Sequence, residues 1–93
     1  MSEVVMYCTR FCPYCIRAEQ LLKRKGVEIK IISVDNKPDL WYFMVKISGR
    51  NTVPLIFFGE YHVGGFDEMV ELDMDDELYL LLEPILEAMK LQG

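Results

Sequence analysis

Four short apolar stretches recur along the chain and predict the strands of a sheet. Runs that are apolar or β-branched predict four strands, at residues 3–7, 27–34, 54–58 and 61–63. Gly59-Glu60 separates the last two runs and predicts a tight hairpin turn between them. The third and fourth strands should therefore pair antiparallel.

Two segments between these strands carry helix signals. Over residues 13–25 apolar side chains recur at about 3.6-residue spacing, and Pro13 suits the first turn because its missing N–H has no partner there. A second helix is predicted from Pro38, with Gly49 as its stop. Its interior is apolar nearly all round, so length and flanking residues decide this assignment rather than periodicity.

Two acidic segments complete the pattern. Residues 66–74 and 75–91 are predicted as helices, and Pro84 should kink the second helix or split it from its first turn. The predicted order is βαβαββαα, so the first two strands, joined by a helix, should form a parallel pair with a right-handed crossover. Together with the hairpin, this order predicts an α/β fold on a mixed sheet.

Length and composition fit a single domain over residues 1–93. Hydrophobic residues make up 52% of the chain and aromatic residues 12%, which suffices for one core and argues against disorder. The apolar run at 78–82 is too short to span a bilayer, and the run at 4–7 lacks the features of a targeting segment. We therefore expect a soluble, cytoplasmic protein with no membrane partner.

Charge is distributed unevenly around a net charge of −5. Residues 1–52 carry nine Lys and Arg against five Asp and Glu, a net +4, whereas residues 53–93 carry one Lys against ten acidic residues, a net −9. No dense basic run or aromatic–basic interleaving is present, so we expect no nucleic-acid partner. The basic half suits a small anionic substrate or an acidic partner surface.

The basic half contains the motif Cys12-Pro13-Tyr14-Cys15. With Cys12 at a helix N-cap and Cys15 one turn inside, the two thiols face one side of the helix within reach of a disulfide. Free N–H groups and the positive end of the helix dipole favour a thiolate at Cys12, which is the predicted nucleophile. Cys15 is predicted to resolve the mixed disulfide formed at Cys12.

Other interpretations of the cysteines are weaker. A structural zinc site needs four ligands, and beyond the motif only Cys8 and His62 remain, so no metal is expected. A purely structural pair of thiols is disfavoured by the Pro-Tyr between the two cysteines at a strand-to-helix junction. Cys8 is predicted to be a small buried apolar group, with a regulatory disulfide or glutathionylation as the alternative. Three cysteines in all fit a reducing compartment better than a secreted disulfide framework.

Three motifs together resemble those of the glutaredoxin family, in family order and spacing: Cys12-Pro13-Tyr14-Cys15, Thr52-Val53-Pro54 and Gly64-Gly65-Phe66-Asp67. The resemblance extends from Val4 to about Leu86. It implies a thioredoxin-like fold, in which a four-stranded mixed β-sheet of strand order 2-1-3-4 carries helices on both faces. The active-site cysteine would follow the first strand, beside Pro54 and the glycine corner.

The resemblance also implies a binding site for glutathione as co-substrate. The backbone of Val53, before a cis Pro54, would pair with the cysteine of glutathione as an added strand does, and Thr52 belongs to the same element. The γ-glutamyl end would be held at the start of a helix by Gly65, Phe66 and Asp67, with Asp67 meeting the ammonium group. Tyr14 would flank the bound thiol.

Two basic residues complete the implied site. Lys46 occupies a place where family members commonly hold a polar residue near the glycyl carboxylate, and a surface lysine without a ligand is an equal alternative. Many dithiol glutaredoxins carry lysine three residues before the first motif cysteine, but here that residue is Thr9. Arg10 is the hypothesised source of the missing positive charge.

The implied activity is reduction of protein disulfides and glutathione mixed disulfides by a monomeric enzyme. Its partners would be glutathione and disulfide-containing or glutathionylated proteins, with ribonucleotide reductase as a family-level candidate. Two alternatives stay open. The protein could be a glutaredoxin-like electron donor recycled by thioredoxin reductase, or a scaffold in which Cys12 and glutathione ligate a [2Fe–2S] cluster in a dimer. Family members of the second kind usually lack Pro13.

Overall fold

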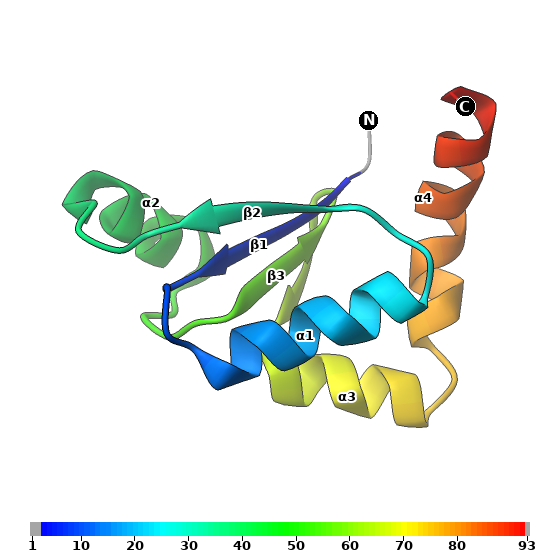
Figure 1. Cartoon of the computed structure of the whole chain (residues 1–93), viewed down its shortest axis with the longest axis horizontal. Helices are drawn as coiled ribbons and strands as arrows, with labels where there is room; N and C mark the ends of the chain where they lie inside the picture. Colours follow the sequence, from blue (N-terminus) through cyan, green and yellow to red (C-terminus); the bar gives the residue numbers. More distant parts are fainter. Residues whose placement is uncertain (1–2, 93) are drawn as a thin grey trace.

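The computed structural model describes residues 3–92, which form eight elements in the predicted βαβαββαα order (Figure 1). The strands are β1 (Val4–Cys8), β2 (Ile29–Ser33), β3 (Leu55–Phe58) and β4 (Tyr61–Gly64). The helices are α1 (Pro13–Arg24), α2 (Pro38–Ser48), α3 (Phe66–Met74) and α4 (Leu78–Gln92). Every predicted element is present, although β2 is shorter than predicted and α4 begins later.

The four strands form one mixed sheet in the order β2-β1-β3-β4. The central strand β1 pairs parallel to β2 and antiparallel to β3, and β3 pairs antiparallel to β4. The predicted strand order and the predicted parallel and antiparallel pairs are confirmed. This topology leaves the C-terminal end of β1, where the cysteine motif follows, between edge strand β2 and strand β3.

Helices cover both faces of the sheet because successive side chains of a strand point to opposite faces. On one face, α1, α3 and α4 contribute the buried side chains Ala18, Leu22, Met69, Leu78, Leu82 and Ile85. On the other face, Met44 of α2 packs with Tyr7 of β1 and Leu55 of β3. Figure 1 shows α1 and α3 side by side over the first face. The motif cysteines Cys12 and Cys15 belong to the cluster on the first face.

Pro84 does not split α4, which runs without interruption from Leu78 to Gln92. Pro84 lies on the exposed side of the helix, and the residue whose carbonyl loses its N–H partner, Leu80, is itself 63% exposed, so water can satisfy that carbonyl. The buried neighbours Leu82 and Ile85 hold the helix against the core on either side of the proline. Within residues 3–92, none of the helices has the length and apolar character that crossing a membrane requires.

Candidate active site

The junction between β1 and α1 places Cys12 at the N-cap of the helix, as predicted. Pro13 occupies the first helical turn, where a backbone N–H would have no partner. The Cys12 sulfur accepts a hydrogen bond from the backbone N–H of Cys15 at 3.2 Å. An N–H donor and the positive end of the helix dipole both favour negative charge at this position. The local geometry therefore suits a nucleophilic sulfur.

Cys15 lies one turn further along α1 and is 4% exposed, against 8% for Cys12. Burial raises the pKa of the Cys15 thiol well above its usual range, and the hydrogen bond between its side chain and that of Cys12 raises it further. Both cysteines, and Cys8, are free thiols. The structure is thus that of the reduced dithiol, with Cys15 protonated beside Cys12.

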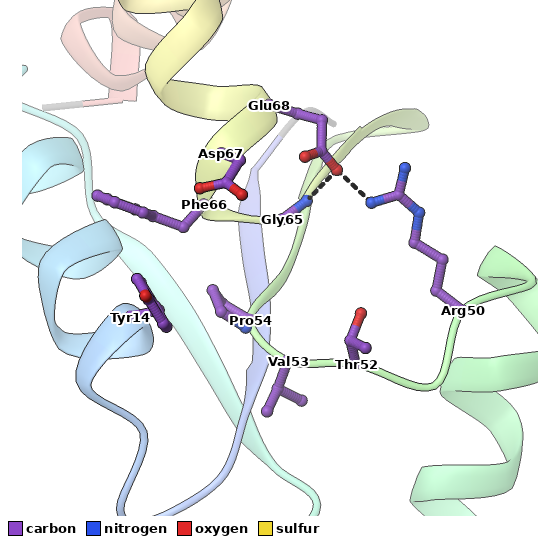
Figure 2. A pocket seen from close by; sticks show the side chains of 9 residues that line it. All are labelled: Tyr14, Arg50, Thr52, Val53, Pro54, Gly65, Phe66, Asp67 and Glu68. Atoms are coloured by element: carbon purple, nitrogen blue, oxygen red, sulfur yellow. Dashed lines mark hydrogen bonds and ion pairs between the residues drawn. The ribbon is translucent and has the colours of Figure 1, made fainter.

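A pocket of about 260 Å³, called the main pocket below, opens near the start of α1 (Figure 2). Its lining comes from α1, the loop between α2 and β3, and the start of α3: Tyr14, Arg50, Thr52, Val53, Pro54, Gly65, Phe66, Asp67 and Glu68. Cys12 lies at the edge of this main pocket, because its sulfur is 3.9 Å from the carbonyl oxygen of Val53. The Val53–Pro54 peptide bond is cis, as the family resemblance implies.

Most of the residues singled out in the sequence lie together in the main pocket, namely Tyr14, Thr52, Val53, Pro54, Gly65, Phe66 and Asp67. Lys46 does not line it and is exposed on the last turn of α2. Arg10 is also exposed, and its backbone N–H donates to the carboxylate of Asp35. Arg10 lines a separate groove with the cysteines, so the structure does not bring these two cations into the main pocket.

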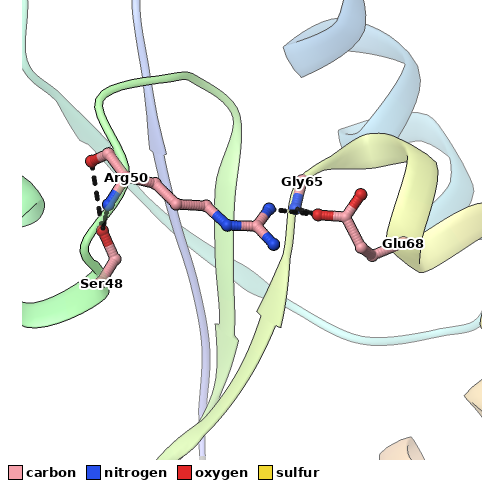
Figure 3. Close-up of polar contacts among 4 residues, drawn as sticks. All are labelled: Ser48, Arg50, Gly65 and Glu68. Carbon is pink, nitrogen blue, oxygen red and sulfur yellow. Dashed lines mark hydrogen bonds and ion pairs between the residues drawn. The ribbon is translucent and has the colours of Figure 1, made fainter.

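Arg50 and Glu68 line the main pocket but are not predicted by the sequence motifs. One carboxylate oxygen of Glu68, Oε1, accepts a hydrogen bond from the Gly65 N–H at 3.0 Å and pairs with the Arg50 guanidinium (Figure 3). At the other end, the Arg50 backbone N–H donates to the Ser48 hydroxyl at 3.0 Å. Arg50 and the Gly65 N–H hold the pKa of Glu68 below its usual range. This network joins the loop after α2 to the start of α3.

The sequence did contain one signal for this network. Glu68 is the third residue of α3, and its bond to the N-cap N–H of Gly65 is one half of a capping box, a pattern that can be read from spacing alone. Arg50 lies in a loop and has no comparable signal. Its role depends on a partner 18 residues away, which only the folded chain brings near.

Gly64 lets the backbone pass close to this ion pair. Its φ is +111°, and a Cβ there would lie 2.6 Å from Glu68 Oε1 and 3.1 Å from an Arg50 guanidinium nitrogen. Real Cβ atoms do not approach so closely, so any larger residue would displace the two side chains. Glycine at 64 therefore serves the positive φ of the backbone and also leaves room for the Glu68–Arg50 pair.

Aromatic rings line the side of the main pocket that lies across from Arg50 (Figure 2). Tyr14 and Phe66 lie with their ring centroids 5.8 Å apart, and the Arg17 guanidinium carbon is 5.6 Å from the Tyr14 ring centroid. The pocket therefore offers an apolar wall, a guanidinium, two carboxylates and the free N–H groups at the start of α3. Among residues 3–92, no group of three or more His, Cys, Asp or Glu side chains is arranged to hold a metal ion.

Comparison with known proteins gives concordant results at the level of sequence. The family model described as Glutaredoxin matches residues 4–63. The chain is 49% identical over 82 residues to a glutaredoxin of Pseudomonas aeruginosa, covering 88% of this chain and 98% of that protein. It is 41% identical over 83 residues to glutaredoxin 3 of Escherichia coli, covering 89% and 100% of the two chains.

Solved structures of similar shape are also glutaredoxins. A buckwheat glutaredoxin–glutathione complex superposes with a TM-score of 0.82 at 28% identity, covering 89% of this chain and 78% of the other. The solution structure of a glutaredoxin from Brucella melitensis gives a TM-score of 0.77 at 45% identity, with coverages of 88% and 89%.

Proposed function

The chain belongs to the glutaredoxin family, and on that premise we propose that it reduces protein disulfides and glutathione mixed disulfides with glutathione as its co-substrate. Its fold is the thioredoxin-like fold of that family, and the family supports a thiol–disulfide oxidoreductase activity. The observation that carries the more specific proposal is the position of Cys12, at a helix N-cap on the edge of a pocket with groups suited to glutathione.

In the proposed reaction with a glutathionylated protein, the Cys12 thiolate attacks the glutathione sulfur of the mixed disulfide. A disulfide forms between Cys12 and glutathione, and the protein thiolate leaves and takes up a proton. A second glutathione, as thiolate, then attacks the glutathione sulfur bound to Cys12. Glutathione disulfide is released and Cys12 returns as a thiolate, so each cycle consumes one free glutathione, reduces one mixed disulfide and releases one glutathione disulfide.

For a protein disulfide, Cys12 attacks first and becomes linked to the substrate. Cys15 then loses its proton and attacks the Cys12 sulfur, which releases the reduced substrate and leaves a Cys12–Cys15 disulfide for glutathione to reduce. Burial, and after it the hydrogen bond to the Cys12 side chain, raise the pKa of Cys15, so Cys15 is less reactive than Cys12 toward an incoming disulfide. The order of attack then follows from the different environments of the two sulfurs.

The main pocket supplies groups for both ends of glutathione. Val53 offers backbone hydrogen bonds at the centre, and Asp67 with the start of α3 offers partners for the γ-glutamyl ammonium and carboxylate. Of the two cations, Arg50 lines the pocket and Lys46 does not, so we propose Arg50 as the residue that meets a carboxylate of glutathione. The solved buckwheat complex, a glutaredoxin with glutathione, supports this ligand class. A reducing compartment such as the cytoplasm would keep the thiols reduced between cycles.

A coupled assay tests the proposal, with a glutathionylated peptide as substrate and glutathione recycled by its reductase. We expect Cys12→Ser to lose activity and Cys15→Ser to retain a substantial part of it, because deglutathionylation needs one thiol. Wild-type turnover with thioredoxin reductase, and none with glutathione, would refute the proposal in favour of the electron-donor alternative. A paired comparison of Arg50→Gln with Lys46→Gln tests the pocket, and we expect KM for the glutathionylated substrate to rise in the first variant only.

A further inference from the structure

All three cysteines of the chain line a second hollow on the other side of Cys12 from the main pocket. This thiol groove, of about 250 Å³, lies between α1 and the edge strand β2. Its lining residues are Met6, Cys8, Thr9, Arg10, Cys12, Cys15, Ile16, Glu19, Ile31 and Ser33. The proposed glutathione reaction uses Cys12 and Cys15 but leaves Cys8 without a role.

Cys15 shares this groove with both of the other thiols. Its side chain lowers the pKa of Cys8, against the larger effect of burial, and the side chain of Cys12 raises the pKa of Cys15. All three cysteines belong to one packed cluster in the core. The backbone of Cys8 is fixed, since it ends β1 in register with Ser33 and its carbonyl accepts from the Val34 N–H at 2.9 Å. Cys8 is therefore held in the same cluster and the same groove as the resolving cysteine.

From this arrangement we propose that Cys8 is a third exchanging thiol. It converts the Cys12–Cys15 disulfide into a Cys8–Cys15 disulfide. The Cys8 thiolate, having lost its proton to water, attacks the Cys15 sulfur. The Cys8–Cys15 bond forms, the Cys12–Cys15 bond breaks, and the electron pair leaves with Cys12 as a thiolate. No electron is gained or lost, so the step needs no further oxidant or reductant.

The shared groove suits this step, because thiol–disulfide exchange needs the attacking, central and leaving sulfurs close together. The leaving sulfur is Cys12, which the Cys15 N–H and the helix N-terminus favour as an anion. Burial raises the pKa of Cys8, the Cys15 side chain lowers it in part, and the charges of Cys12, Asp35 and Glu19 raise it again. With a raised pKa, Cys8 does not compete with Cys12 for substrates and acts only on Cys15 inside the groove.

The product would be an oxidised protein that still presents a nucleophilic Cys12. Such a form can accept glutathione or a protein thiol at Cys12 while the disulfide is held inside the groove. This inference rests on the proposed function, since it starts from the Cys12–Cys15 disulfide of that cycle. It adds to the cycle a second oxidised state, reached without a second substrate.

Tryptic mapping separates the two disulfides directly. Cleavage after Arg10 and Arg17 places Cys8 in the peptide 1–10, and both Cys12 and Cys15 in the peptide 11–17. A Cys12–Cys15 disulfide therefore stays within one peptide, whereas a Cys8–Cys15 disulfide joins two. Wild-type protein is oxidised with glutathione disulfide, quenched with acid, alkylated with N-ethylmaleimide and digested. We expect the joined peptides, with Cys12 alkylated or glutathionylated.

Variants decide the assignment. In Cys12→Ser, oxidised with diamide, the joined peptides should become the main intramolecular product, and they should vanish in the matched double variant Cys8→Ala/Cys12→Ser. If Cys12→Ser yields no joined peptides and the wild type yields only the internal disulfide of 11–17, the inference is wrong. If the wild-type protein is nevertheless active in the coupled assay, only the role of Cys8 is refuted and the proposed function is not affected. Absence of coupled activity refutes the proposed function instead.

Discussion

Replacement of Gly64 by alanine is the sharpest structural test of the corner that holds Arg50 and Glu68. The substitution imposes two separate penalties. The backbone at φ +111° is unfavourable for any residue with a Cβ, and the added Cβ would lie 2.6 Å from Glu68 Oε1. Glu68 must then move, which breaks its bond to the Gly65 N–H and its ion pair with Arg50.

The expected cost can be assembled from these terms. Backbone strain contributes about 1–3 kcal/mol, and the lost hydrogen bond to Gly65 about 0.5–1.5 kcal/mol. The ion pair contributes at most about 1 kcal/mol, because its side chains are 44% and 37% exposed and water screens them. A total of about 3 kcal/mol corresponds to a fall in melting temperature on the order of 15 °C for a domain of this size.

Gly49→Ala is the matched control. Gly49 ends α2 in the left-handed region with φ +71°, and no atom lies within 4 Å of a Cβ built there. Its replacement carries only the backbone penalty, about 1–2 kcal/mol. Urea denaturation of both variants measures the difference, and we expect Gly64→Ala to be the more destabilised by about 1–3 kcal/mol.

Making Gly64→Ala in a Glu68→Ala variant separates the steric contact with Glu68 from the backbone strain. In Glu68→Ala protein the carboxylate is absent, so Gly64→Ala should cost only its backbone term, and the two substitutions should be non-additive by about 1 kcal/mol or more. Equal costs for Gly64→Ala and Gly49→Ala, or an unchanged cost in the Glu68→Ala background, would refute the reasoning.

Further predictions concern titration and packing. The pKa of Glu68 is lower in the folded state than in the unfolded chain, where it is about 4.3. The ionised carboxylate therefore stabilises the fold above that pH, and this stabilisation is lost as pH falls through the folded-state pKa. Glu68→Gln should make the free energy of unfolding in urea depend less on pH on the acid side. The pKa of Cys15 is raised, so the unfolded chain loses this proton first and stability should fall as pH rises above about 8.5. Cys15→Ser should make that slope shallower in the same denaturation series, the remainder coming from Cys8 and Tyr7, whose pKa values burial also raises. An unchanged slope would contradict the assignment. Leu82→Ala should cost about 2–4 kcal/mol in thermal melts because the side chain is fully buried, whereas Leu80→Ala in the same helix, at 63% exposure, should cost far less.

The fold was largely predictable because local signals and long-range packing agree. The apolar and β-branched strand runs, Pro13 and Pro38 at helix starts and the Gly59-Glu60 turn each mark an element that the structure contains. Pro84 shows the limit of local signals, because its preference predicts a kink or a split in α4 and the helix is not split. Burial of apolar side chains on both sides of the proline outweighs that preference, and burial is a property of the tertiary structure that the local sequence does not report.

The site was predictable to the extent that it consists of contiguous motifs. Seven motif residues converge on the main pocket because each motif sits at the end of an element whose position the topology determines. Lys46 and Arg50 illustrate the limit. Both are cations near the end of α2, and only the path of the loop after Gly49 decides which of them faces the pocket.

The pairing of Arg50 with Glu68 has a thermodynamic consequence for anything that binds there. A carboxylate that binds Arg50 must compete with the carboxylate of Glu68, which already pairs with the guanidinium. Because Glu68 belongs to the same chain, its effective concentration at Arg50 does not fall when the protein is diluted. The observed affinity is then the difference between two ion pairs rather than the strength of one. An anionic ligand would be held loosely beside Arg50 and released quickly, which suits the proposed cycle, in which glutathione disulfide must leave at every turn.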